Sequence, residues 1–107
     1  MSDKPWKASE RAIAAYIGGV RVPITGRARG ATPDIAHPWL VPEVKRVEKF
    51  PHWLAEAYEQ ALAAHLTLVA QDGRERLPVV IVHPHRTCVE KCYVLMSLAD
   101  LMRLRHV

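Results

Sequence analysis

The stretch from Pro33 to Lys45 constrains the fold of this chain more than any other part of its sequence. It ends in Glu43-Val44-Lys45, and because side chains in a strand alternate between two faces, Glu43 and Lys45 would project from the same face. If Asp34 begins a neighbouring strand, its carboxylate can converge with that of Glu43 on one hard divalent cation. The alternative interpretation is a solvated turn followed by a surface strand that carries an ion pair.

The rest of the chain predicts helices that alternate with short strands. A helix from Lys7 to Ile17 is followed by Gly18-Gly19, a pair suited to ending helices. A second helix runs from His52 to about Ala64 or Ala70, before the turn signal Asp72-Gly73. The other expected elements are strands at Val20–Ile24, Trp39–Val47, Leu77–Val82 and Cys92–Met96 and a short helix at Leu98–Leu104. This order predicts an α/β fold, with a central mixed β-sheet flanked by helices.

Length and composition narrow the class of protein. At 107 residues the chain is expected to be a single domain, residues 1–107, with a hydrophobic core of its own. Two cysteines are too few for a disulfide scaffold, and no apolar run reaches the length of a membrane span. Since Met1 to Lys7 lacks a hydrophobic signal segment, we expect an intracellular protein without a membrane partner.

Positive charge gathers in the first half of the sequence. The net charge is +4, and the first fifty residues hold nine Lys or Arg against five Asp or Glu, whereas the remainder holds six of each. The segment Thr25–Thr32 adds two glycines, two arginines and two threonines directly before Asp34. Guanidinium groups, hydroxyls and backbone N–H groups all suit a phosphate backbone, although an ordinary flexible loop has the same composition.

One carboxylate is expected on an apolar helix face. Glu10 shares a stripe with Trp6, Ile13 and Ile17, at helical spacing. A carboxylate on such a face needs a cation, a hydrogen-bond partner or a place at the rim of the core. A slightly rotated helix would instead pair Glu10 with a neighbouring basic residue.

These motifs resemble the PD-(D/E)xK nuclease superfamily. Asp34, Glu43 and Lys45 match its motif, and Glu10 on a first helix followed by a glycine pair is similar to archaeal and phage Holliday junction resolvases. The resemblance implies a restriction-endonuclease-like fold and a metal-dependent endonuclease that cleaves four-way or branched DNA in recombination and repair. It also implies a homodimer, no organic cofactor and a cytoplasmic location in a prokaryotic cell or a phage-infected host.

The resemblance also implies a role for each matching residue. Asp34, Glu43 and Glu10 would hold Mg²⁺, for which Mn²⁺ can substitute, and Lys45 would position the attacking water. Gln60 would orient Lys45 or the water, and Thr25 would assist near the scissile phosphate. The expected DNA-backbone contacts are Arg21, Arg27, Arg29, Arg46 and Lys49.

Two other functions remain open from the sequence. The first is a nuclease of the same superfamily that acts on DNA ends or flaps. The second is a non-catalytic nucleic-acid-binding module or a zinc-stabilised one, with His83, His85, Cys88 and Cys92 as ligands. For a dimer, the terminal segment offers an apolar surface made of Leu98, Leu101, Met102 and Leu104.

Overall fold

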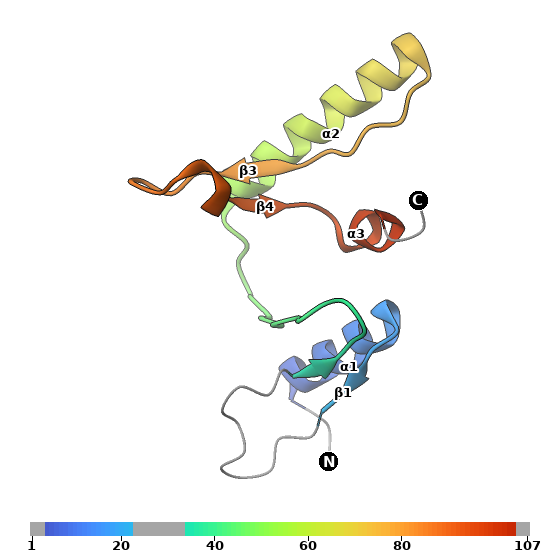
Figure 1. The fold of residues 1–107 in the computed structure, drawn as a ribbon, viewed down its shortest axis with the longest axis vertical. Coiled ribbons are helices and arrows are strands. Elements are labelled where there is room, and N and C mark those ends of the chain that lie inside the picture. Colours follow the sequence, from blue (N-terminus) through green and yellow to red (C-terminus); the bar gives the residue numbers. More distant parts are fainter. Residues whose placement is uncertain (1–3, 23–33, 105–107) are drawn as a thin grey trace. The chain divides into compact units, whose positions relative to one another are not determined.

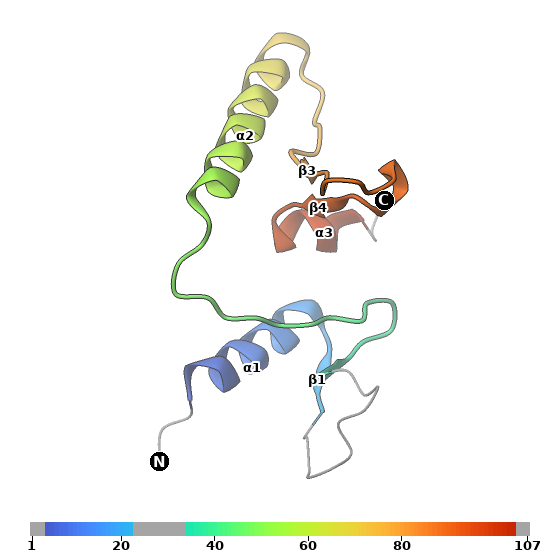
Figure 2. The same cartoon turned by 90° about the vertical axis from the view of Figure 1, so that its left-hand side faces the viewer.

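The computed structural model describes residues 4–22 and 34–104, and the chain divides into two compact units, Met1–Glu48 and Lys49–Val107. Helices and small antiparallel sheets together make up both units (Figure 1; Figure 2). The mixed helix-and-sheet composition agrees with the sequence. The single domain that we expected stays a prediction.

The first unit begins with helix α1, Pro5–Ile17. Proline suits the first helical position because it needs no hydrogen-bond partner there. The Lys4 carbonyl accepts the first backbone bonds of the helix, and Gly18 ends it in the left-handed conformation at φ 77°. The helix predicted from Lys7 to Ile17 is therefore confirmed, with two further residues at its start.

A two-stranded antiparallel sheet follows α1 in this unit. Strand β1 (Val20–Arg21) pairs with β2 (Ile35–Ala36), so that Arg21 lies opposite Ile35. The Val22 N–H extends the pairing by donating to the Asp34 carbonyl at 2.8 Å. The buried apolar side chains are Ala14, Ile17 and Ile35, and the last of these is completely inaccessible to solvent. The sheet therefore packs against α1 and holds Asp34 at its edge.

The strand predicted from Trp39 to Val47 is wrong. Residues 37–47 form an extended segment without strand pairing to any described residue. Pro38 and Pro42 lack the backbone N–H that a strand ladder requires, which explains the loss of pairing. The segment that carries Glu43 and Lys45 is therefore not anchored by a sheet.

A histidine organises the start of this segment. The Nδ1 atom of His37 accepts the backbone N–H groups of Trp39 and Leu40 at 3.3 and 3.1 Å. Its Nε2 lies 2.8 Å from the Ile17 carbonyl at the end of α1, where an N–H on that nitrogen donates. His37 therefore connects the turn after β2 with the helix.

The second unit is built on helix α2, His52–Asp72, which ends at Gly73 in the left-handed conformation. Strands β3 (Val80–Val82) and β4 (Tyr93–Leu95) pair antiparallel, with Ile81 opposite Val94. A 3₁₀ turn at Val89–Lys91 precedes β4, and helix α3 (Leu98–Leu104) follows it. Figure 1 shows β3 alongside α2, which it contacts. The helices and turn signals predicted here are confirmed, and the strands are shorter than predicted.

The described strands form two separate two-stranded sheets, and they do not join into the central mixed sheet that we expected. Each strand is only two or three residues long, and prolines lie close to β2 and β3. None of the helices in residues 4–22 and 34–104 is long and apolar enough to span a membrane.

Candidate active site

A hollow of about 270 Å³ in the first unit brings together four of the predicted catalytic residues, Glu10, Asp34, Glu43 and Lys45. They come from α1, from the start of β2 and from the extended segment after it. The complete lining is Trp6, Glu10, Asp34, Glu43, Val44, Lys45 and Arg46. The chain thus gathers on one surface carboxylates that lie far apart in the sequence.

Asp34 lines this hollow as a buried acid that has no cationic partner among the described residues. The residue is 8 % exposed and lies directly before β2, where pairing with Val22 fixes its backbone. Among the described residues, no hydrogen bond or ion pair engages its carboxylate. A cation that enters the hollow would give the Asp34 carboxylate a partner of opposite charge.

Glu43 and Lys45 form an ion pair at the rim of the hollow. The Lys45 Nζ lies 3.5 Å from Glu43 Oε1, and both side chains are mostly exposed. The two side chains share one side of the extended backbone, as the sequence predicted, although the segment is not a strand. Exposed pairs of this kind contribute about 0–1 kcal/mol to stability, so this pair can separate at little cost.

Glu10 is buried and already has a cationic partner. The residue is 5 % exposed, and its Oε1 accepts from Arg21 Nε at 3.1 Å. Arg21 keeps 27 % of its side chain exposed. The need for a cation that we inferred for Glu10 is thus met by an arginine of β1.

Arg46 binds the beginning of α1. Its Nη1 donates to the Pro5 carbonyl at 3.4 Å and to Ser9 Oγ at 3.2 Å. From the sequence, Arg46 was expected at the DNA backbone, and Ser9 carried no signal of a role. The anchor joins residues 37 and 41 positions apart, and no local pattern in the sequence indicates it.

Gln60 and Lys49, two other predicted site residues, are not among the residues that line this hollow. Gln60 and Lys49 are exposed residues of the second unit. Thr25, Arg27 and Arg29 lie outside the described residues. The roles assigned to these five residues stay predictions. Trp6 was expected on the stripe of Glu10, and it does line the hollow, although it is 45 % exposed.

The donor atoms fit Mg²⁺ in kind. Magnesium is usually bound by one or two carboxylates and several waters, and Asp34 and Glu43 can supply the two carboxylates. Within residues 4–22 and 34–104, however, no three His, Cys, Asp or Glu side chains lie close enough together to hold an ion. Glu10 as a third ligand therefore stays a prediction.

The proposed zinc ligands do not form a metal-binding group either. All four are described residues, and they are His83, His85, Cys88 and Cys92. The His83 Nε2 instead lies 2.6 Å from the Thr87 carbonyl, and both cysteines are free thiols. The zinc-stabilised alternative gains no support from this loop.

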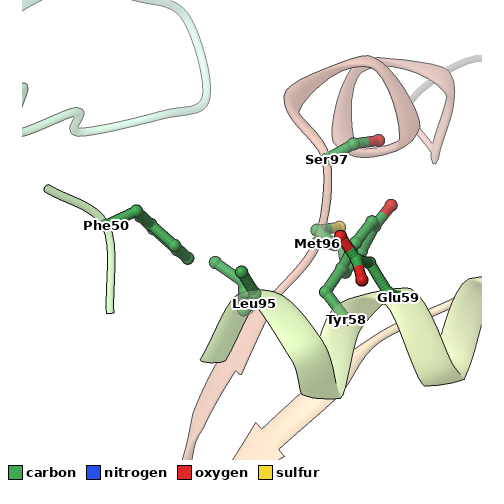
Figure 3. Close-up of a pocket in the computed structure, with 7 residues that line it drawn as sticks. Phe50, Tyr58, Glu59, Leu95, Met96 and Ser97 are labelled. Carbon is green, nitrogen blue, oxygen red and sulfur yellow. The ribbon is translucent and has the colours of Figure 1, made fainter. Parts of the chain in front are cut away.

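A second hollow, of about 300 Å³, lies in the second unit between the first half of α2 and the connection from β4 to α3 (Figure 3). Its lining is Phe50, Ala55, Tyr58, Glu59, Leu95, Met96 and Ser97. It contains one carboxylate and no basic group, so it offers no site for phosphate chemistry.

No protein-family model, no curated protein and no solved structure matches this chain.

Proposed function

We propose that this protein is a Mg²⁺-dependent DNA endonuclease of the PD-(D/E)xK superfamily, with a restriction-endonuclease-like fold, and that it resolves Holliday junctions. The observation that carries the proposal is the gathering of Asp34, Glu43 and Lys45 around one hollow in the first unit. Two carboxylates can hold a metal ion that assists phosphodiester hydrolysis, and an ammonium beside them can orient the attacking water.

Asp34 and Glu43 would hold the ion. Bound Mg²⁺ would polarise the phosphoryl oxygen and make a coordinated water more acidic. Lys45 would leave its weak pair with Glu43 and orient the attacking water through a hydrogen bond. Mn²⁺, which also accepts oxygen ligands, would substitute for Mg²⁺.

The DNA would be held by the basic first half of the chain. A four-way junction needs two symmetric nicks, and a chain with one site can make one at a time, so we propose a homodimer. Its surface would include α3, on which Leu98 and Leu104 are exposed and Leu101 and Met102 are half-buried. Light scattering of the full chain tests the dimer.

Cleavage assays on a four-way junction, a flap and a linear duplex test the proposal directly. Each substrate is incubated with and without Mg²⁺, at equal protein concentration. We expect paired nicks in the junction that require the metal. Preferential cutting of the flap or of duplex ends would move the protein to the second candidate function, and binding without cutting of any substrate would contradict an endonuclease.

A further inference from the structure

We infer that Glu10 is a positioning residue that aims Arg21 at a phosphate of the substrate, and that it is not a ligand of the metal. This inference rests on the proposed function, because it names how the same site would bind DNA.

The geometry of the pair is the first support. Glu10 engages Arg21 only through Nε, at 3.1 Å. Within the described part of the chain, the two terminal amino groups of Arg21 make no hydrogen bond. A guanidinium presents five N–H donors in a rigid fork, so the bond to Nε fixes the plane and leaves the terminal donors for a second oxyanion.

The surroundings of the pair are the second support. Glu10 is buried on α1, whereas the Arg21 side chain is 27 % exposed, so the carboxylate is the fixed partner and the arginine reaches toward solvent. Arg21 lies opposite Ile35 in the sheet, one residue from Asp34. The oriented guanidinium therefore belongs to the same short sheet that holds the proposed metal ligand.

Loss of the Glu10 charge should change the affinity for DNA in a different direction for each possible role of Glu10. Removing the negative charge of Glu10 should strengthen binding of a polyanion if charge alone matters. If Glu10 orients Arg21, the same change should weaken binding, because the arginine loses its fixed geometry. If Glu10 is a metal ligand, its loss should change Mg²⁺ binding and leave metal-free DNA binding unaltered.

The experiment measures the anisotropy of a fluorescein-labelled four-way junction in EDTA, so that no cleavage occurs. We expect Arg21→Ala and Glu10→Ala each to weaken binding by about tenfold, a typical effect of losing one charge-assisted contact. The double variant should bind no more weakly than either single variant, since both remove one shared interaction. Arg21→Ala should also reduce the slope of log affinity against log salt by about 0.9.

Glu10→Gln provides the rescue, because the amide oxygen keeps an acceptor for Arg21 Nε without the charge. We expect this variant to bind the junction to within about twofold of the wild type and to bind Mg²⁺ as the wild type does in calorimetric titration of the DNA-free protein. Circular dichroism checks that each variant is folded, and Glu10→Gln remains informative if Glu10→Ala is not. The control is Arg74→Ala, which removes one exposed positive charge from the second unit.

Two results overturn the inference: junction binding by Glu10→Ala that equals or exceeds that of the wild type, or loss of Mg²⁺ binding in Glu10→Gln. Both leave the proposed function intact if the wild-type protein binds and cuts the junction. A wild-type protein that binds no junction at all contradicts the proposed function itself.

Discussion

The described parts of the two units differ in how many carboxylates they bury. The first unit encloses two carboxylates, Glu10 and Asp34, beside the apolar residues Ala14, Ile17 and Ile35. In the described part of the second unit the one buried acid is Asp100, and α2 has no buried residue along its 21 positions. Burying charge is costly, so a unit that encloses two carboxylates in its small core is the one in which to look for chemistry.

One ion pair of the first unit connects two elements at the candidate site, whereas two pairs of the second unit join close sequence neighbours. Asp72 with Arg76 and Asp100 with Arg103 are pairs of close sequence neighbours in the second unit. The pair of Glu10 with Arg21 spans eleven residues and connects a helix to a strand. Local pairs stabilise the ends of elements, whereas the long-range pair fixes the relative position of two elements at the candidate site.

The largest expected effect is on turnover. Asp34→Asn, Glu43→Gln and Lys45→Ala should each lower junction cleavage by at least about 100-fold with Mg²⁺ present. Because Asp34 is confined without a partner, Asp34→Asn should hold the free energy of unfolding or raise it by up to about 1 kcal/mol. Cleavage assays and urea unfolding measure the two quantities. Asp100→Asn is the matched control, and near wild-type turnover in any of the three variants would exclude this active site.

The next effect is a loss of stability, which should be larger for alanine at Gly19 than for alanine at Gly73. A Cβ on Gly19 would lie 2.7 Å from Ile35 Cγ2 and 2.8 Å from the Ala36 carbonyl oxygen, so Gly19→Ala should cost about 1–3 kcal/mol. Gly73 has open space around it but a φ of +70°, so Gly73→Ala should cost only about 1 kcal/mol. Urea unfolding compares them. A larger loss from Gly73→Ala would contradict the close approach of Gly19 to β2.

A smaller effect is expected at the anchor of the extended segment. Residues 37–47 form no strand ladder with the described residues, and the bonds from Arg46 to the Pro5 carbonyl and Ser9 Oγ connect this segment to α1 close to Glu43 and Lys45. Arg46→Ala should lower turnover roughly fivefold, which corresponds to the ~1 kcal/mol of one hydrogen bond. Ser9→Ala should lower it in the same direction. If Arg46 contacts DNA instead, Ser9→Ala will leave turnover unchanged and Arg46→Ala will change only the affinity.

The smallest effect is a pH dependence of the second unit. The hydrogen bond from Arg103 lowers the pKa of Asp100 below its ordinary value of 3.8, burial opposes that shift, and Ser97 and His65 add to the lowering. A lowered folded pKa means that the ionised carboxylate stabilises the fold above about pH 4 and that this contribution is lost as the pH falls through the folded pKa.

The thermal unfolding temperature of the wild type should therefore fall more steeply than that of Asp100→Asn as the pH is lowered from about 5 to 3. The lowered pKa of Asp72, which Arg76 binds, is present in both proteins and cancels in the comparison. Parallel curves would show that Asp100 contributes nothing specific to acid sensitivity.

The helices could be predicted from the sequence, because apolar periodicity and the glycines after Ile17 and Asp72 act within a few residues. The sequence also indicated two side chains with oxygen donors, Asp34 and Glu43, and these share one hollow with Lys45. The strand predicted at Trp39–Val47 does not form. The alternating pattern there is typical of a strand, but two prolines cannot complete its hydrogen-bond ladder.

The partner of each charged group follows from tertiary packing and could not be read from local sequence. Glu10 could have faced a metal or a neighbour on its own helix, and packing of α1 against β1 gave it Arg21. Arg46 was expected to contact the DNA backbone, which stays a prediction, and in the structure it binds the Pro5 carbonyl and Ser9 Oγ of α1. A local sequence pattern encodes whether a segment is a helix or a strand and on which face a side chain lies. The partner of a charged group depends instead on which distant part of the chain packs within about 3 Å of it.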